Sequence, residues 1–340
     1  MVKVAVVGCG YWGPNLIRNF HGLDGCELVM ACDMDPARLA QVQKGFPSVK
    51  VTTKFQDVLD SDVDAVALAT PARTHHPLGM QVLNAGKHLL VEKPLAMSSP
   101  QCEDMIMAAE RRRLVLMVGH TFLYSPALLK TKELSSPEYL GDMFYLYTQR
   151  VNLGRVQSDL NALWSIAPHD ISIALHIMGA FPVEVSAHGS CFLKPGIEDV
   201  VFATLTFPGG RLANIHASWI DPGKVRKVIV VGSKRMIVYD DLAEEGKVKV
   251  YDKGVVKGNG PVFGEFHYKL HSGDIFSPRI AMSEPLANEC GHFVQCIREG
   301  KTPISDGVNG LHVVRILEAA QHSLQHQGMP VRMSMERVAA

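Results

Sequence analysis

A glycine-rich turn near the start of the chain constrains its fold more than any other feature of the sequence. Gly8, Gly10 and Gly13 fit the pattern G-x-G-x-x-G, with Tyr11 and Trp12 between the last two, directly after the apolar run VKVAVV. The first glycine allows a tight turn, the second lets a pyrophosphate approach the backbone, and the third lets a helix pack closely on the strand. The free N–H groups at the start of that helix would bind the phosphates. The turn therefore predicts a dinucleotide site, the alternative being an ordinary glycine-rich turn.

From Val2 to His120 the chain alternates short β-branched runs with helix-like segments. Strand candidates are the runs VKVAVVG, ELVMACD, VKVTT, AVALAT, HLLVEK and VLMVGH. Several are apolar at nearly every position, as expected for strands buried on both faces of a parallel sheet. Pro14, Pro36 and Pro100 stand where helices would begin, and proline is favoured in a first helical turn. This order predicts a Rossmann-type α/β domain with a doubly wound parallel sheet.

After His120 the pattern changes. A helix is expected from Pro126, but from Val183 onward strand-like runs follow one another without helices between them: VEVSAHGSCF, VVFATLTF, RLANIHASWI, KVIVVG, RMIVYD and KVKVYD. Such an order predicts a mostly antiparallel sheet and an α+β domain. We expect a first domain over residues 1–122 and a second over residues 123–340. Residues 284–325 have helical periodicity, and these C-terminal helices could pack back on the first domain.

Charge and cysteine content exclude several classes of protein. The chain has 34 Lys and Arg and 34 Asp and Glu residues, so it lacks the basic excess that attracts nucleic acid or an anionic membrane. Its seven Cys form no C-x-x-C pair, and no ligand spacing is found, so we expect neither disulfides nor a metal site. With no leader-like N-terminus and no apolar run of membrane-spanning length, we expect a cytoplasmic enzyme of metabolites.

Asp33 ends the second strand candidate, close to the distance of about 20 residues at which an acidic residue binds the adenine ribose in dinucleotide-binding domains. A carboxylate there accepts hydrogen bonds from both ribose hydroxyls and repels a 2′-phosphate. Met34 follows it, and no Arg stands next to it. The sequence therefore predicts NAD rather than NADP as the cofactor. The alternative is a solvated aspartate ahead of the helix that starts at Pro36.

Further candidate residues follow the fourth and fifth strand candidates. Ligands of open parallel sheets bind beyond the carboxyl ends of the strands. Thr70, Pro71 and His75 lie past the fourth strand, whereas Glu92 and Lys93 end the fifth. We expect all five at the cofactor, and a lysine there can exchange a proton with a hydroxyl or carbonyl group. A solvated side chain is the alternative for Lys93 and for His75.

His169 is the histidine that we single out among 15. Pro168 is expected to open a helix that runs to about Met178, so His169 would lie in its first turn. The positive end of the helix dipole disfavours an imidazolium ion and leaves a neutral ring that can exchange a proton, although capping or packing is the alternative. Four further side chains could contact substrate, with core packing or a charged surface loop as alternatives: His120, Tyr124, Arg150 and Arg155.

Three stretches of the chain, GCGYWG, TPARTHHPLGMQVLNAGKHLLVEKPLA and APHDISIALHIMG, resemble in this order the family of glucose-fructose oxidoreductase and inositol dehydrogenase, Gfo/Idh/MocA. The resemblance covers nearly the whole chain. It implies a Rossmann domain that binds NAD(P) and a second domain whose large open sheet contacts substrate and usually forms a homodimer or homotetramer. The stretch SGDIFSPRIAMSEPLANECGHFVQCIREGKTPISDG resembles the branch that oxidises nucleotide-linked sugars at C3, notably UDP-N-acetyl-glucosaminuronate.

By this resemblance the family's catalytic lysine falls on Lys93 and its active-site histidine on His169. Many members carry an aspartate where this chain has Ser165, and a glycine where it has Ala167. Serine cannot act as a carboxylate base. Either Lys93 and His169 divide the proton transfer, with Ser165 left to contact substrate, or the chain is catalytically impaired.

The resemblance implies hydride transfer between nicotinamide and a secondary hydroxyl of a sugar. Three alternatives stay open at this point. The chain could reduce a 3-keto nucleotide sugar, it could act on inositol or another sugar, or it could bind NAD and a sugar as a regulator without catalysis.

Overall fold

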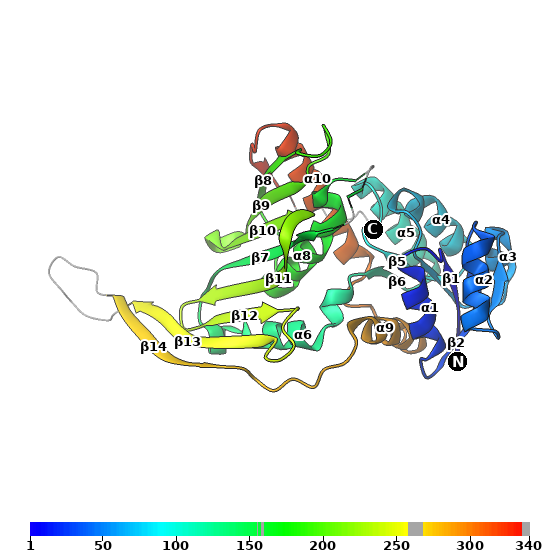
Figure 1. The fold of residues 1–340 in the computed structure, drawn as a ribbon, viewed down its shortest axis with the longest axis horizontal. Helices are drawn as coiled ribbons and strands as arrows, with labels where there is room; N and C mark the ends of the chain where they lie inside the picture. Colours follow the sequence, from blue (N-terminus) through cyan, green and yellow to red (C-terminus); the bar gives the residue numbers. More distant parts are fainter. Residues whose placement is uncertain (155, 158–159, 258–267, 335–340) are drawn as a thin grey trace. The chain divides into compact units, whose positions relative to one another are not determined.

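The computed structural model describes residues 1–154, 156–157, 160–257 and 268–334. The chain forms two compact units (Figure 1). Of the described residues, the first unit combines Met1–Tyr124 with Ser283–Arg315, and the second combines Ser125–Met282 with residues 316–334. The first unit therefore takes in a C-terminal segment that follows the whole central part of the chain.

The first unit is built on a parallel sheet with the strand order β3-β2-β1-β4-β5-β6. Its strands are β1 (Val2–Val7), β2 (Cys26–Cys32), β3 (Lys50–Thr52), β4 (Ala65–Leu68), β5 (His88–Glu92) and β6 (Leu116–Gly119). Every residue of β4 and β6 is buried, as expected for a sheet covered on both faces. The strand order reverses between β1 and β4, and ligands of doubly wound folds bind at such a point. All six strands predicted from the sequence are confirmed.

Helices cover this sheet. They are α1 (Gly13–His21), α2 (Pro36–Gly45), α3 (Phe55–Asp60), α4 (His75–Asn84), α5 (Ser99–Arg112) and α9 (Pro285–Glu299), with the short 3-10 turns η1 (Ala72–Thr74) and η2 (Thr121–Tyr124). A proline stands in the first turn of α1, α2 and α5, as predicted. Helix α9 packs against α1 and η2, where Phe293 meets Phe20 edge to face. The C-terminal segment is thus part of the core of the first unit.

The second unit holds a sheet with the strand order β14-β13-β12-β11-β7-β10-β9-β8-β15. Its strands are β7 (Met143–Leu153), β8 (Glu184–Ser190), β9 (Val200–Thr206), β10 (Leu212–Ser218), β11 (Ile220–Gly232), β12 (Met236–Asp240), β13 (Val248–Lys257), β14 (Tyr268–Phe276) and β15 (Val331–Arg332). Among the pairs that these strands form, β7 and β10 run parallel and the others antiparallel. The mostly antiparallel sheet is confirmed, but the sequence did not reveal β7, β14 and β15.

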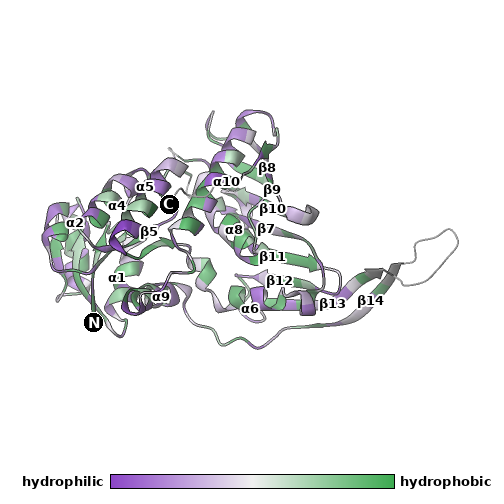
Figure 2. Cartoon of the chain, turned by 180° about the vertical axis from the view of Figure 1, so that it is seen from behind, coloured by the Kyte–Doolittle hydropathy of each residue, from purple (hydrophilic) through white to green (hydrophobic). Residues whose placement is uncertain are grey.

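Strand β7 escaped notice because polar residues point toward the core. Leu146, Thr148 and Arg150 are buried, whereas Tyr145 and Tyr147 are exposed on the other face. Helix α8 (Ala162–Met178) packs against β7, β9 and β10, and α6 (Pro126–Leu134) against β12 and β13. The remaining helical elements are α7 (Pro137–Leu140), η3 (Pro208–Gly210) and α10 (Gly307–Gln325). Figure 2 shows apolar residues along the strands of both units.

Helix α8 corrects one prediction. It begins at Ala162, where the side chain of Asn161 caps it by accepting a hydrogen bond of 3.1 Å from the backbone N–H of Trp164. Pro168 lies inside the helix and does not open it, so His169 lies in the middle of α8 and not in its first turn. His169 therefore does not lie at the positive end of the helix dipole, and the prediction that this end keeps its ring neutral was wrong. The strong cap at Asn161 sets the start, and the missing N–H of Pro168 leaves one backbone bond unmade without ending the helix.

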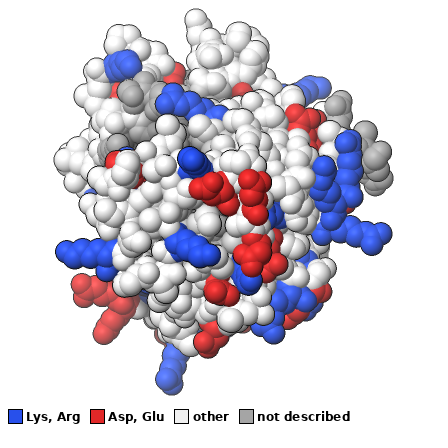
Figure 3. Space-filling view, turned by 90° about the vertical axis from the view of Figure 1, so that its right-hand side faces the viewer, with Lys and Arg blue, Asp and Glu red and all other residues white. Residues whose placement is uncertain are grey.

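The surface carries both charges. On the face shown in Figure 3, basic and acidic side chains are interspersed, in line with their equal numbers in the chain. No helix in the part of the chain that the structure describes has the length and apolar character needed to cross a membrane.

A buried ion pair joins the central strand of the second unit to its main helix. Arg150 of β7 donates a hydrogen bond of 2.6 Å from Nε to Oδ2 of Asp170 in α8, and its Nη2 lies 3.5 Å from Oδ1. The Asp170 side chain is 1 % exposed. Such a pair offsets the desolvation of both charges only while both partners remain. We therefore expect it to fix the position of α8 on the sheet.

Removing the charge of Asp170 should destabilise the second unit. In Asp170→Asn a buried guanidinium is left without its counter-ion, which commonly costs about 3–5 kcal/mol. Denaturant unfolding of Asp170→Asn and of Glu133→Gln makes a matched comparison, since Glu133 pairs with Lys130 on the surface of α6 and should contribute below about 1 kcal/mol. Equal stability of the two variants would contradict a structural role for the buried pair.

Candidate active site

The glycine turn after β1 is held against the end of β4 and the start of α1. Gly8 has a φ of +93°, and a Cβ atom there would lie 2.6 Å from the carbonyl oxygen of Ala69. A Cβ atom on Gly13 would overlap the carbonyl oxygen of Gly8 itself. Both positions therefore require glycine. No side chain caps the start of α1, which leaves this helix end open to a phosphate group, although Pro14 has no N–H and the N–H of Asn15 bonds to the Trp12 carbonyl oxygen. This cradle fits a dinucleotide.

Asp33 lies directly after β2 and faces the glycine turn. Its side chain is buried, Oδ2 accepts a hydrogen bond of 2.6 Å from the backbone N–H of Cys9, and Oδ1 accepts one of 2.9 Å from Asp35 N–H. These bonds hold the carboxylate at the edge where the sequence predicts the adenine ribose. Tyr11, which belongs to the glycine turn, is exposed.

Arg38 of α2 is a residue that the sequence interpretation missed. Its Nη1 lies 3.4 Å from Oδ2 of Asp33, so a cation does stand beside the predicted ribose carboxylate. No Arg lies next to Asp33 in the sequence, but the first turn of α2 brings Arg38 back toward Asp33. An arginine five positions after the acidic residue, early in a predicted helix, is the signal that could have revealed it.

His75 joins the loops that follow β4 and β5. Its ring is 1 % exposed, with Nδ1 2.7 Å from the carbonyl oxygen of Pro94 and Nε2 2.9 Å from that of Thr70. Burial lowers the pKa of this histidine, and a neutral ring donates from only one nitrogen. His75 therefore links the loop after β4, which carries Thr70 and the exposed Pro71, to the loop after β5, which carries Lys93. Because His75 is itself buried, it supports these predicted cofactor residues from inside the protein.

Lys93 follows the last residue of β5 and is half-buried. Its charge acts on three neighbours, Glu92, His75 and His120. Burial raises the pKa of Glu92 to about 7, against the opposing effects of Lys93 and of the Trp12 indole. Burial, assisted by Lys93, lowers the pKa of His120 to about 3, so that ring is neutral. The structure thus brings Trp12 and His120, which are distant in the sequence, close to the neighbouring residues Glu92 and Lys93.

Several buried polar atoms of this cluster have no hydrogen-bond partner among the described residues. They are both ring nitrogens of His120, together with Oε1 of Glu92 and Nε1 of Trp12; the Trp12 indole lies near the Glu92 carboxyl group but without the geometry of a hydrogen bond. Buried polar groups are nearly always paired, so unpaired ones gathered at strand ends mark a place where a ligand or water supplies the partners. Tyr124 differs, because its buried hydroxyl lies 2.8 Å from the hydroxyl of Ser305. For Tyr124 a substrate contact stays a prediction.

The other predicted substrate residues belong to the second unit. Ser165 and His169 lie one turn apart on the half-buried side of α8, and Ser165 Oγ accepts a hydrogen bond of 2.9 Å from Nε2 of Gln157. Arg150 is engaged by Asp170, and Arg155 lies outside the described residues. In the part of the chain that is described, no three His, Cys, Asp or Glu side chains gather as a metal site would require.

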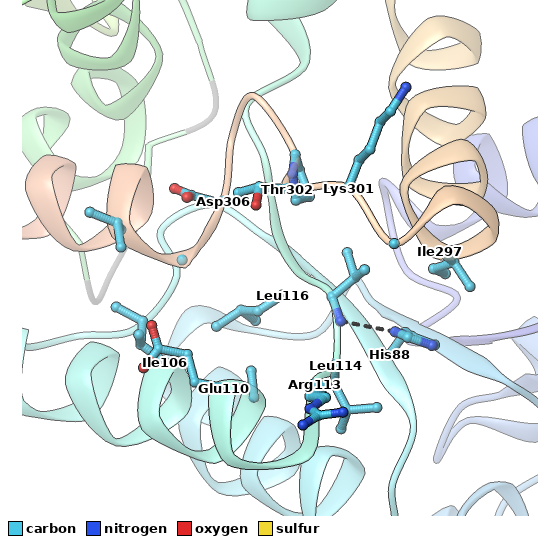
Figure 4. Close-up of a pocket in the computed structure, with 16 residues that line it drawn as sticks. His88, Ile106, Glu110, Arg113, Leu114, Leu116, Ile297, Lys301, Thr302 and Asp306 are labelled. Carbon is cyan, nitrogen blue, oxygen red and sulfur yellow. Dashed lines mark hydrogen bonds between the residues drawn. The ribbon is translucent and has the colours of Figure 1, made fainter. Parts of the chain in front are cut away.

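A pocket of about 350 Å³ lies at the opposite end of the first sheet (Figure 4). It is bordered by His88 and Leu116, the first residues of β5 and β6, and by Arg113, Lys301 and Asp306. In Figure 4 the backbone N–H of Val115 donates to Nδ1 of His88. Because ligands of doubly wound sheets bind beyond the carboxyl ends of the strands, this pocket is not the dinucleotide site.

Two further residues, Thr121 and Glu289, lie near Glu92 and were not predicted from the sequence. Thr121 Oγ1 donates a hydrogen bond of 2.8 Å to Oε2 of Glu289, a fully buried carboxyl group on α9. The signal for Glu289 was available, because it shares the apolar face of α9 with Leu286, Cys290 and Phe293. A carboxylate on the buried face of a helix is rare unless it is paired.

Comparison with known proteins agrees with this geometry. The sequence model of the GFO/IDH/MocA oxidoreductases with an NAD-binding Rossmann fold matches residues 2–120, and the model of the GFO/IDH/MocA C-terminal domain matches residues 147–238. The chain is 27% identical to UDP-N-acetylglucosamine 3-dehydrogenase of Acidithiobacillus ferrooxidans, over 92% of this chain and 94% of that protein. It is 25% identical to the NAD-dependent scyllo-inositol 2-dehydrogenase of Bacillus subtilis, over 99% of this chain and 97% of the other.

Solved structures share the fold. The Acidithiobacillus ferrooxidans dehydrogenase superposes with a TM-score of 0.80 at 24% identity, covering 95% of this chain and 97% of its own. GenD2 from gentamicin A biosynthesis, solved in complex with NAD, gives a TM-score of 0.82 at 24% identity, covering 98% of this chain and 96% of its own. With both of its domains matched, the chain belongs to the GFO/IDH/MocA family and is an oxidoreductase that uses NAD.

Proposed function

We propose that this enzyme oxidises a secondary hydroxyl group of a sugar, at C3 of a nucleotide-linked sugar, with Lys93 as the group that receives the hydroxyl proton. The observation that carries the proposal is the position of Lys93 at the carboxyl end of β5, amid buried polar groups and in the same unit as the glycine turn. The 27% identity to a UDP-N-acetylglucosamine 3-dehydrogenase, over nearly the full length of both chains, supports the substrate class.

Bound NAD supplies the hydride acceptor, and the protein must position the sugar and move a proton. The proposed reaction breaks the C–H bond of the carbinol, whose hydride passes to NAD, and forms a C=O bond, while the O–H proton passes to the Lys93 amine. His169 would share this proton or orient the hydroxyl, and Ser165 would hydrogen-bond the substrate without acting as a base. The half-buried Glu92, whose Oε1 is buried, and the neutral His120 would set the electrostatic environment of the amine.

The dinucleotide would lie over the glycine turn with its adenine ribose on Asp33. Gly8, Gly10 and Gly13 leave room for the pyrophosphate at the start of α1, and Thr70 and Pro71 lie on the loop after β4. The Arg38 guanidinium beside Asp33 would neutralise part of the carboxylate charge while leaving its oxygens able to accept hydrogen bonds.

Lys93→Met should abolish turnover without preventing NAD binding. Loss of a group that transfers a proton in the transition state commonly costs about 10²–10⁴-fold in rate. Turnover is followed as NADH absorbance with a panel of UDP-sugars and inositols, in both reaction directions, and NAD affinity by calorimetry. Lys44→Met, at an exposed position in α2, serves as the control. Near-normal kcat in Lys93→Met would refute the role proposed for Lys93.

Asp33→Ala should weaken NAD binding by about 1.5–3 kcal/mol for each charge-assisted hydrogen bond lost. Calorimetric titration of the purified chain with NAD measures the change. Asp60→Ala is a matched control, because Asp60 is an exposed acid at the end of α3 whose side chain accepts a hydrogen bond from Gln56 of the same helix. That variant should keep its NAD affinity. Wild-type affinity in Asp33→Ala would remove the ribose assignment.

We further propose that the enzyme is a homo-oligomer whose subunits meet on the open face of the second sheet. On this face, opposite α8, the rings of Tyr145 and Tyr147 stack with centroids 6.3 Å apart, and those of Phe202 and His216 with centroids 4.3 Å apart. The three aromatic side chains other than His216 are each at least 40% exposed. Phe202 and His216 are in register on neighbouring strands, Tyr145 and Tyr147 lie two residues apart on β7, and such a group of exposed aromatic rings on one face favours a covered surface.

Light scattering tests this proposal through the molar mass in solution. The wild-type chain should have at least twice the mass of one subunit, and Tyr147→Lys should reduce it, because an ammonium group would be buried at the contact. Leu129→Lys, at an exposed apolar position on α6, should leave the mass unchanged. A monomeric wild-type chain would contradict the proposal.

A further inference from the structure

Glu289 is a buried acid in the first unit that the proposed reaction does not yet use. It lies on α9 and is 0% exposed. Its Oε2 accepts the hydrogen bond from Thr121 Oγ1, and its Oε1 has no hydrogen-bond partner among the described residues. An ionised carboxylate in such a place would be strongly destabilising, so the group must be paired, neutral or both.

Glu92 is the second carboxyl group of this cluster. It ends β5 in register with Gly119, the last residue of β6, and a Cβ atom at Gly119 would lie 3.0 Å from the Glu92 carboxyl carbon and both oxygens. The absence of a side chain at Gly119 thus makes room for the Glu92 carboxyl. Because Thr121 follows two residues after Gly119, its bond to Glu289 brings the two acids to the same end of β5 and β6.

The two acids affect each other's ionisation. Burial raises the pKa of Glu289 well above its usual value, and the charge of Glu92 raises it further. Burial also raises the pKa of Glu92, but the neighbouring Lys93 and the Trp12 indole favour its charged form. Two interacting carboxyl groups lose their protons in two separate steps, and the group with better partners ionises first. That group is Glu92.

We propose that Glu92 and Glu289 are an acid pair that retains one proton, held by Glu289, so that a single negative charge on Glu92 lies beside Lys93. Glu289 is then a positioning residue, which acts on Lys93 through Glu92. A second negative charge would attract a proton to the lysine amine and oppose its release. The effect of this acid pair on turnover rests on the proposed role of Lys93. The retained proton does not depend on that role, because it is a property of the first unit by itself.

Other titratable groups near Glu289 would not replace the pair. Cys290 follows it on α9, and burial together with both glutamates raises the pKa of its thiol, so it stays neutral. Tyr124 in η2 has a raised pKa from burial and is also neutral. Glu284, ahead of α9, binds Arg18 of α1 on the surface, and this pair lowers its pKa. Among these groups, Glu92 is therefore the one whose negative charge acts on Glu289 inside the first unit.

Infrared spectroscopy of the full chain tests for the retained proton. At about pH 8, far above the usual glutamic acid pKa of about 4.3, the wild-type protein should still show the band of a protonated carboxyl group. Glu289→Gln should remove this band. Glu103→Gln, which alters a partly exposed carboxyl bound to Arg315, is the matched control and should leave it. A wild-type spectrum without the band, or a band that survives in Glu289→Gln, overturns the proposal.

The coupling between the acids is tested in Glu92→Gln. Without the charge of Glu92, the remaining acid should lose its proton at a lower pH than in the wild-type protein. The pH dependence of the infrared band measures this shift. An unchanged titration of the band would show that the two groups do not act as a pair, which overturns the proposal.

Turnover distinguishes a positioning role from a purely structural one. Glutamine resembles the protonated acid, so Glu289→Gln should keep kcat at neutral pH within about threefold. In the wild-type enzyme, kcat should change at the higher pH at which Glu289 loses its proton and the infrared band disappears. Glu289→Gln should lack this change in kcat. A folded Glu289→Gln variant that binds NAD but is inactive at neutral pH overturns the proposal, because a charged Glu289 would then be required. If Lys93→Met is fully active, the proposed function fails, whereas the infrared results still decide on the pair.

Discussion

The close approach of the glycine turn to its neighbours is the constraint on which the first unit depends. Gly13 lies so near the Gly8 carbonyl, and Gly8 so near the end of β4, that a side chain at either position would push β1, β4 and α1 apart. This contact places the start of α1 at the carboxyl ends of the strands. The positions of Asp33, Thr70 and Lys93 matter for cofactor chemistry only because that edge is fixed.

The polar groups behind this edge show how burial controls charge. Lys93 stands next to a carboxyl group with a pKa of about 7 and near a histidine with a pKa of about 3, and in both cases burial is the largest cause. Burial can thus limit the number of charged side chains at a site where protons are exchanged. In the second unit burial is offset in another way, because the buried side chains of Arg150 and Asp170 are joined by a hydrogen bond of 2.6 Å.

The division of the chain into two units also divides the proposed chemistry. The unit with the Rossmann sheet carries the dinucleotide cradle and Lys93, and it recruits α9 from the C-terminal part of the chain. The unit with the large sheet carries His169 and Ser165 on α8. Family members with full-length similarity act, by their names, on a nucleotide sugar and on an inositol, which is consistent with one cofactor unit serving different substrates.

The sequence by itself determined the parallel sheet, the glycine turn, Asp33 at the end of β2 and Lys93 at the end of β5, because these follow from local patterns of apolar residues, glycine and proline. It did not determine β7, whose buried Thr148 and Arg150 break the alternating pattern, or the true start of α8, which the cap at Asn161 decides. The positions of Arg38 beside Asp33 and of Glu289 near Glu92 were decided by tertiary structure alone. Their partners lie on other elements, and both the pairing and the burial of a charge depend on which elements meet.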